Sequence, residues 1–442
     1  MTDATARSWG RLPAIPATRV ERLHFRDQAL PLARFGDSIL PWGNGRSYGD
    51  SCLNAGGTLL DVSGLDRFLG FDAQTGVLRC EAGVQMGQIL EVFVPRGFFL
   101  PVAPGTKFVT VGGAIANDVH GKNHHREGTF GRHVLRFELL RSDGECLVCS
   151  PTENDEMFRA TIGGLGLTGL ITWAEVRLRP IPSPFIAMES IRFRGVDEFL
   201  HWTRESEAGF EYVVAFVDYL ARGSELGRGH LLRGNHADPR EHLLRRRARR
   251  LPALSVPIET PGFLLNRHAM RLFNALYYHR QRRPRVSRVV HWDPFFHPLD
   301  ALRNWNRLYG HRGFFQYQCV VPLEHDPRAV RALLRAISEA GEPCNLGVMK
   351  AFGDLPSPGL LSFPRPGVTL ALDFPNHGER TLALMTRLDE LVAEAGGALY
   401  PAKDARMSPE HFRRFFPQWR ELEKMRDPRF SSSFWRRMTG DR

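Results

Sequence analysis

The chain has 442 residues, which is too long for one ordinary hydrophobic core and favours at least two domains. Its composition, with 43% hydrophobic and 24% charged residues, is that of a folded protein and excludes global disorder. No stretch approaches the roughly 18 apolar residues that a membrane-spanning helix needs, and the first residues lack the apolar core of a secretory signal. We therefore expect a cytoplasmic protein.

The formal net charge of +11 is concentrated in two segments. Residues 228–250 hold eight Arg against Asp238 and Glu241, and residues 280–288 hold five Arg and no acidic residue. A local excess of this kind indicates contact with an anionic surface or a phosphate group. A flexible, solvated insertion is the alternative interpretation of the same stretch.

Residues 37–180 contain short β-like runs separated by glycine-rich turns. These runs cover 38–43, 58–63, 76–83, 109–116, 133–150 and 170–180. Ser-Asp-Gly at 142–144 predicts a hairpin inside the fifth run. Two helical patterns, 84–97 and 153–163, interrupt the runs. The order predicts an α+β fold in which strands dominate.

Pro180, Pro182 and Pro184 end this pattern and predict a domain boundary. We expect domains over 1–182 and 183–397, with the basic stretch 228–288 as a flexible insertion in the second, and a C-terminal segment over 398–442. Within the second domain, 363–375 is predicted to be a strand at the edge of a pair and 381–396 a helix. The last 40 residues are charged and helical in pattern.

Two motifs that suggest other sites do not have the required context. The GxGxxG at 164–169 follows a helical pattern and precedes a strand, which is the reverse of a Rossmann dinucleotide site. Cys146 and Cys149 lie on a predicted strand, where residues three apart point to opposite faces. The neighbouring His124 and His125 cannot easily converge on one ion. We expect no metal site.

Two glycine clusters are typical of loops that bind a cofactor. In the cluster at 41–50, glycines alternate with polar residues after a strand, so backbone N–H groups can point at an anion. In the cluster at 104–117, small residues allow close approach of a flat ligand. Each cluster alone could be a set of turns. The His-rich loop at 120–125, which is either a solvated turn or a group that handles protons, strengthens the functional interpretation.

Together the motifs GNGRSYGDSCLNAGG, PGTKFVTVGGAIANDVHGKNHH, TIGGLGLTGLI and YPAKD resemble the vanillyl-alcohol-oxidase-type FAD proteins. The resemblance covers nearly the whole chain. It implies a two-domain FAD-binding fold with a mixed α/β substrate domain. The C-terminal segment 398–442 would return to the FAD domain. Within the family, the chain is similar to members that oxidise the 2'-hydroxyl of a polyprenylphosphoryl pentose.

The resemblance also implies roles for individual residues. The catalytic residues would be His120, Lys403 and Tyr48, and the substrate would contact Lys122, Gln318, Lys350 and Thr369. FAD would be held by two loops and two later residues: Gly43, Asn44, Gly45, Arg46, Ser47, Tyr48, Gly49, Gly105, Thr106, Thr110, Val111, Gly112, Gly113, Asn117, His120, Ile171 and Tyr400.

Three positions depart from the family pattern. Related oxidases attach FAD covalently to a His of the first loop, where this chain has Arg46, so we expect non-covalent FAD. The family's reactive Cys is replaced by Ala371 and its neighbouring Asn by Thr369. The lost thiol is not required by the chemistry, whereas the change to Thr369 alters the contacts expected with the substrate.

The resemblance implies that the product is a keto sugar and that a short-chain reductase completes an epimerisation. A lipid-linked sugar phosphate substrate implies a peripheral position at the inner membrane, on an anionic surface. A sugar-alcohol or aldonolactone oxidase with a soluble substrate is the alternative enzyme. A basic nucleic-acid-binding protein is the alternative outside enzymes, but the chain has no recognised binding module, so we expect no nucleic acid as partner.

Overall fold

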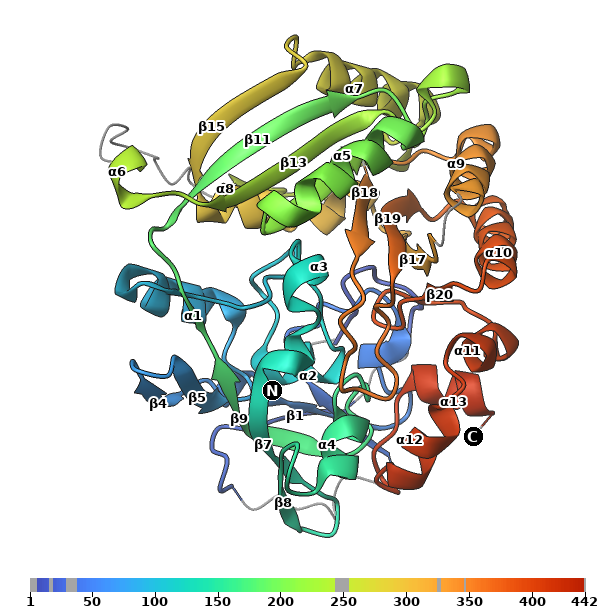
Figure 1. Ribbon diagram of the computed structural model, residues 1–442. Coiled ribbons are helices and arrows are strands. Elements are labelled where there is room, and N and C mark those ends of the chain that lie inside the picture. Colours follow the sequence, from blue (N-terminus) through green and yellow to red (C-terminus); the bar gives the residue numbers. More distant parts are fainter. Residues whose placement is uncertain are drawn as a thin grey trace.

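The computed structural model describes residues 6–15, 19–28, 38–242, 254–323, 327–345 and 347–440. Within them the chain forms two large β-sheets, which lie one above the other with helices at their sides (Figure 1). This mixture of helices and mainly antiparallel strands confirms the predicted α+β class.

The lower sheet of Figure 1 comes from the N-terminal part of the chain. It is antiparallel with the strand order β4-β5-β9-β7-β8, where the strands are β4 (Phe68–Asp72), β5 (Val77–Glu81), β7 (Val134–Leu140), β8 (Cys146–Cys149) and β9 (Leu170–Arg177). A parallel sheet of β1 (Arg19–Arg22), β3 (Thr58–Asp61) and β2 (Ile39–Trp42) accompanies it, and the short β6 (Phe98–Phe99) pairs with β10 (Arg179–Pro180). The predicted hairpin is confirmed, since β7 and β8 pair and Gly144 has a φ of 92°.

Four short helices connect these strands. α1 (Met86–Phe93) and α4 (Asp155–Thr161) confirm the two helical patterns. The prediction of a β-strand at 109–116 was wrong, because most of this run forms the helix α2 (Val111–Ala116). Thr110 is its N-cap, and the Gly113 N–H donates to Thr110 Oγ1 at 3.2 Å. α3 (His124–Glu127) follows in the His-rich loop.

The upper sheet has eight antiparallel strands in the order β15-β11-β13-β12-β18-β19-β17-β20. These strands are β11 (Phe185–Phe193), β12 (Tyr212–Val217), β13 (Gly229–His236), β15 (Arg285–His291), β17 (Phe314–Val321), β18 (Gly347–Phe352), β19 (Gly367–Pro375) and β20 (Ala398–Leu399). The edge position predicted for 363–375 was wrong, because β19 pairs with β17 on one side and β18 on the other. Beside the sheet, β14 (Leu254–Ser255) pairs with β16 (Leu302–Arg303).

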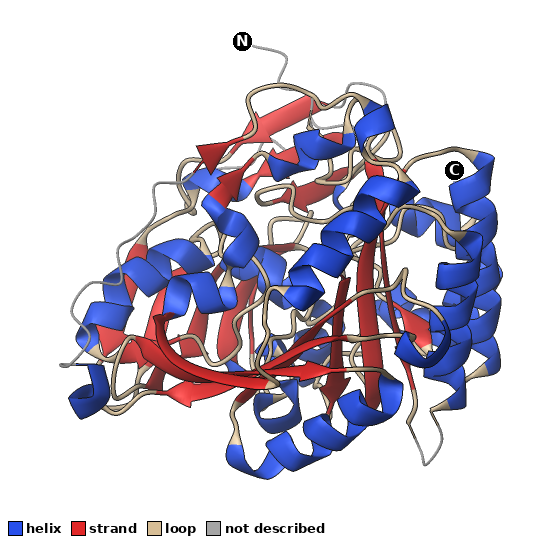
Figure 2. Cartoon of the chain, turned by 90° about the horizontal axis from the view of Figure 1, so that it is seen from above, coloured by secondary structure: helices blue, strands red, loops and turns tan. Residues whose placement is uncertain are grey.

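The two faces of the upper sheet have different partners because side chains alternate along each strand. On one face Ala215, Cys319, Met349 and Leu370 join the hydrophobic core under α5 (Val196–Gly209), α9 (Arg328–Ala340) and α10 (Glu379–Glu394). Figure 2 shows a column of helices along one side of the strands. The opposite face, which carries the intervening residues, is turned toward the N-terminal part and lines a cavity.

The stretch 228–288 is not an insertion over its whole length, so the predicted bounds of the insertion were wrong. Its ends supply β13, in the interior of the sheet, and most of β15 at its edge. Basic residues are tolerated inside because they are paired: Arg233 contacts Glu189 at 2.8 Å and Glu205 at 3.0 Å. The charged cluster Arg245, Arg246, Arg247, Arg249 and Arg250 lies outside the described residues.

Three helices at the end of the chain, α11 (Pro409–Phe415), α12 (Trp419–Met425) and α13 (Ser433–Thr439), lie beside the N-terminal part. The Ser433 N–H donates to Leu53 O at 2.7 Å, and the Ile39 N–H donates to Arg429 O at 2.8 Å. The segment after 398 therefore contacts the first loop of the chain. The division into domains at 182 and 397 stays a prediction.

Candidate active site

A cavity of about 550 Å³ lies between the upper sheet and the glycine-rich loops. Its sheet wall consists of alternate residues of β12, β17, β18 and β19, among them Gln318, Lys350, Thr369 and Ala371. The opposite wall consists of residues from the segments 41–52, 103–122 and 165–171. Segments that are far apart in sequence therefore meet here.

Nearly all the residues predicted for the site line this cavity. The exceptions are Gly49 and Val111, which pack against other parts of the protein. A Cβ on Gly49 would lie 1.6 Å from Asp404 O, so only glycine allows this contact between the two loops. Val111 is fully buried in the hydrophobic core at the start of α2.

The first glycine loop presents unpaired donors to the cavity. Within the described residues, the backbone N–H groups of 43–47 make no hydrogen bond. Arg46 Nε is also buried without a partner in this part of the chain. The Arg46 guanidinium lies 4.2 Å from the Trp9 ring centroid and 5.0 Å from that of Phe108. A row of free N–H groups beside a cation is suited to a phosphate or pyrophosphate.

The second glycine cluster contributes shape rather than an anion site. The Val111 N–H donates to Val84 O and the Gly112 N–H to Ala82 O, both at 2.8 Å, so the start of α2 is already occupied. Gly112 and Gly113 line the cavity without side chains, and a Cβ at either position would approach neighbouring protein atoms to 3.0 Å. This surface is suited to the side of a planar ring system.

His120 lies in the cavity wall with both ring nitrogens in contact with neighbours. Lys350 Nζ lies 2.8 Å from His120 Nδ1, and Gln318 Nε2 lies 2.9 Å from His120 Nε2. Burial, with a further effect of nearby Lys350, lowers the pKa of His120 well below its ordinary value. The ring is therefore neutral at neutral pH, and neither nitrogen is free to receive a proton.

Two lysines of the cavity are held by backbone carbonyl groups. Lys350 Nζ donates to Gly121 O at 2.8 Å, and Lys122 Nζ donates to Phe295 O at 2.6 Å and to Phe296 O at 3.0 Å. Burial lowers the pKa of each lysine to about 7. Both can therefore change charge when a ligand enters the cavity.

Lys403 differs in having no such anchor. Its Nζ lies 3.9 Å from the centroid of the Tyr48 ring, and it makes no hydrogen bond within the described residues. Burial lowers the pKa of Lys403 to about 7, and nearby Asp373 acts in the opposite direction. Burial also holds the pKa of Tyr48 well above its ordinary value, so this hydroxyl stays protonated.

Sequence reasoning missed Gln316 and Asp373, which lie beside Tyr48 and Lys403. Gln316 Nε2 donates to Asp373 Oδ1 at 2.7 Å, and burial raises the pKa of Asp373 to about 6. The signal was available, because Gln316 precedes Gln318 by two residues on β17 and Asp373 follows Ala371 by two on β19. Trp9, which covers Arg46, has no comparable signal in the sequence.

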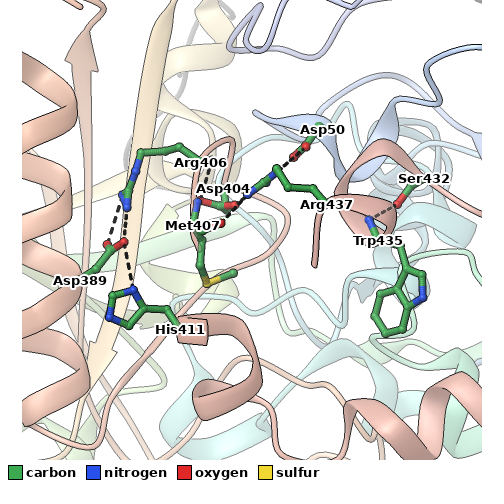
Figure 3. A network of polar contacts seen from close by, with 9 residues as sticks. All are labelled: Asp50, Asp389, Asp404, Arg406, Met407, His411, Ser432, Trp435 and Arg437. Carbon is green, nitrogen blue, oxygen red and sulfur yellow. Dashed lines mark hydrogen bonds and ion pairs between the residues drawn. The ribbon is translucent and has the colours of Figure 1, made fainter. Parts of the chain in front are cut away.

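An ion-pair network fixes the loop that carries Lys403 (Figure 3). Arg437 on α13 donates to both oxygens of Asp50 at 2.8 and 2.9 Å and to Asp404 at 2.9 Å. On the other side of the loop, Arg406 pairs with the buried Asp389. Lys403 is therefore followed directly by a residue that is tied to the first glycine loop.

The described residues contain no group of three or more His, Cys, Asp or Glu side chains that could hold a metal ion. In the same part of the chain, no helix has the length and apolar character needed to cross a membrane.

Comparison with known proteins defines the class of the chain. Residues 29–150 match the FAD binding domain family, which confirms a vanillyl-alcohol-oxidase-type FAD-binding domain. The chain is also 36% identical over 418 residues to decaprenylphosphoryl-beta-D-ribose oxidase from Mycolicibacterium smegmatis, across 91% of this chain and 89% of that protein. It belongs to this family and is an FAD-dependent oxidoreductase.

Two other relatives match a smaller part of this chain. An uncharacterized protein of Streptomyces coelicolor is 36% identical over 373 residues, which cover 80% of this chain and all of that protein. A putative D-arabinono-1,4-lactone oxidase of Neurospora crassa is 25% identical over 167 residues, which are 38% of this chain and 30% of that protein.

Proposed function

We propose that the enzyme oxidises the 2'-hydroxyl of a polyprenylphosphoryl pentose to a keto sugar. The observation that carries this proposal is the 36% identity, over 91% of the chain, to an oxidase named for decaprenylphosphoryl ribose. The putative lactone oxidase matches only 38% of the chain, which disfavours the soluble-substrate alternative.

In this proposal, FAD binds without a covalent link in a domain formed by 1–182 and 398–442. The free N–H groups of 43–47 and Arg46 would hold its pyrophosphate, and Gly112, Gly113 and Tyr400 would border the ring system. Arg46 stands where relatives attach the cofactor through His, and a guanidinium has no nitrogen suited to that bond. The bound flavin supplies a hydride acceptor, and the chain supplies orientation and proton handling.

Lys403 is the group proposed to take the hydroxyl proton. His120 has both nitrogens in contact with Lys350 and Gln318, whereas Lys403 Nζ makes no hydrogen bond within the described residues. A pKa of about 7 leaves much of the amine uncharged at neutral pH, as a general base requires. His120 would instead orient the substrate, and Tyr48 would hold the Lys403 amine against its ring.

The substrate domain, 183–397, would place Gln318, Lys350 and Thr369 against the sugar and Lys122 toward the phosphate. Lys122 and Lys350 acquire full charge as an anion enters, because a negative group within about 4–6 Å raises the pKa of a buried amine. Their anchoring on carbonyl groups fixes where that anion lies.

A short-chain reductase would consume the keto product and complete an epimerisation. We place this reaction on the cytoplasmic side of the inner membrane. The six cysteines are free thiols, as is usual in a reducing compartment, and the lipid part of the substrate requires a bilayer nearby.

The test is anaerobic reduction of the enzyme-bound flavin, followed by its absorbance. We expect decaprenylphosphoryl ribose, or a shorter polyprenyl analogue, to bleach the flavin within seconds, and aldonolactones and free sugar alcohols to leave it oxidised. Bleaching by the soluble compounds alone would overturn the proposed substrate. Mass spectrometry of the product should show the loss of two hydrogens.

A further inference from the structure

Helix α7 (Arg267–His279) buries an asparagine and a tyrosine and exposes three large apolar side chains. Asn274 and Tyr278 are buried, whereas Leu272, Phe273 and Leu276 are 62%, 49% and 64% exposed. Surface helices normally show the opposite arrangement, with the apolar stripe against the core. The exposed stripe therefore requires another explanation.

The orientation of α7 is fixed by its polar face. Asn274 Nδ2 donates to Asp218 Oδ1 at 3.0 Å, and the Tyr278 carbonyl lies 3.1 Å from His230 Nε2. Asn266 caps the helix by accepting from the His268 and Ala269 N–H groups. Rotation that buried the apolar stripe would break these contacts and leave buried polar groups unpaired, so the stripe stays outside.

Exposed apolar side chains are concentrated in the same part of the chain as α7. Seven of the ten large apolar side chains exposed in the described chain fall between 254 and 299: Leu254, Ile258, Leu264, Leu272, Phe273, Leu276 and Leu299. Leu299 also lines the cavity. In Figure 1, α7 lies at the top of the molecule, on the side of the upper sheet.

The charge around α7 identifies what covers it. The segment 267–288 contains seven Arg and no acidic residue. Arg280, Arg282, Arg283 and Arg288 are exposed and form no ion pair within the described residues. Arg285 is also exposed, but it lies on the α5 side of the sheet, where it approaches Glu189 and Glu205 at 4.0 Å and the Trp202 ring at 5.3 Å. A two-fold contact with a second copy would bring these clusters together, and like charges would repel. An anionic bilayer would bury the apolar side chains of the stripe and attract the arginines.

We propose that α7 lies in the surface of an anionic membrane. Leu272, Phe273 and Leu276 enter the boundary between headgroups and acyl chains, and the arginines after the helix contact lipid phosphates. This deepens the proposed function, because it holds the cavity next to the bilayer that contains a lipid-linked substrate. The observations on α7 stand independently of which sugar is oxidised.

The test is sedimentation of the FAD-loaded enzyme with liposomes of phosphatidylglycerol or of phosphatidylcholine. We expect binding to phosphatidylglycerol at low salt and release at about 0.5 M salt, where charge is screened. A triple variant, Leu272→Ser, Phe273→Ser and Leu276→Ser, should lose at least about tenfold in partitioning, because three apolar side chains leave the boundary. These residues are exposed, so folding should be kept.

Leu382→Ser on α10, which is 37% exposed, is the matched control and should bind as the parent does. Flavin reduction by a short-chain soluble substrate should be unchanged in the triple variant. Equal binding of parent and triple variant, or no binding at low salt, overturns the proposal, as does a dimer in light scattering that the triple variant abolishes. If only the proposed function were wrong, the enzyme would still bind the liposomes, but the polyprenylphosphoryl pentose would not reduce the flavin.

Discussion

At the scale of single residues, Lys403 differs from the other lysines of the cavity in being held by an aromatic ring instead of a carbonyl. We expect Lys403→Ala to retain FAD and to lose at least about 100-fold in the rate of flavin reduction, the lower end for a general acid–base group. Stopped-flow absorbance measures this rate. Lys424→Ala removes an exposed lysine paired with Glu421 and should react as the parent does. An unchanged rate in Lys403→Ala would exclude this residue from proton transfer.

Asp373 opposes the shift that burial imposes on the pKa of Lys403. The pKa of Lys403 is lowered to about 7 by burial, and the negative charge of Asp373 opposes that shift. The rate of flavin reduction should therefore rise with pH through about 7 as Lys403 loses its proton. Asp373→Asn removes the charge but can keep the contact with Gln316, so the inflection should move to lower pH. An inflection that stays in place would mean that another group sets the profile.

The resemblance implies that Ala371 stands where the family has a reactive thiol. Of the remaining cysteines, Cys52 lines the cavity, but burial raises its pKa to about 12 and keeps it a thiol. Cys319 points to the opposite face of the sheet. Turnover with a nitroaromatic inhibitor should leave the protein mass unchanged, whereas Ala371→Cys should gain an adduct and Ala371→Ser should not. An adduct on the parent protein would show that a different cysteine reaches the flavin.

At the scale of elements, α13 fixes the two loops that meet at Tyr48 and Lys403. Arg437 connects Asp50 and Asp404, whose side chains are only 3% and 5% exposed. Arg437→Ala would leave two buried carboxylates without a cation and should lower the free energy of unfolding by about 3 kcal/mol, the low end for a broken buried pair because Arg437 itself is 27% exposed. Urea denaturation measures this change. Arg420→Ala, on the exposed face of α12, should have little effect.

The elements also show what the sequence could predict. The helices at 86–93, 155–161 and 379–394 and the hairpin at Gly144 follow local patterns, and the structure contains all of them. The β-like run before Asn117 is a helix because Thr110 caps it and because its N–H groups bind carbonyls of a segment near 82. Strand β13 lies within an arginine-rich stretch, and its place in the sheet depends on pairing with Glu189, which no local pattern reveals.

The site divides in the same way. Residues in the glycine loops and the His-rich loop could be predicted, because each loop has a characteristic local sequence. Strand alternation could have placed Gln316 and Asp373 on the cavity face, but their contact with each other required the register of β17 against β19, where Gln316 lies opposite Asp373. Trp9 and Arg437 act from the two ends of the chain, and their roles exist only after both ends have folded onto the first glycine loop.

At the scale of the whole molecule, one cavity is built from segments that span the chain from Trp9 to Lys403. A ligand that fills it should therefore stabilise the whole fold. Because Arg46 offers no site for a covalent link, acid precipitation should release all the flavin into the supernatant. Flavin left in the pellet would contradict non-covalent binding.

Enzyme stripped of FAD under milder conditions tests the energetic side of the same prediction. Its thermal unfolding temperature should rise as FAD is added back, because a ligand at 100 times its Kd stabilises the native state by about 2.7 kcal/mol. Arg46→Ala removes the cation between Trp9 and Phe108 and should require more FAD for the same rise. Arg126→Ala, at an exposed position outside the cavity lining, is the control. If adding FAD to the stripped protein does not change its unfolding temperature, the cavity is not the cofactor site.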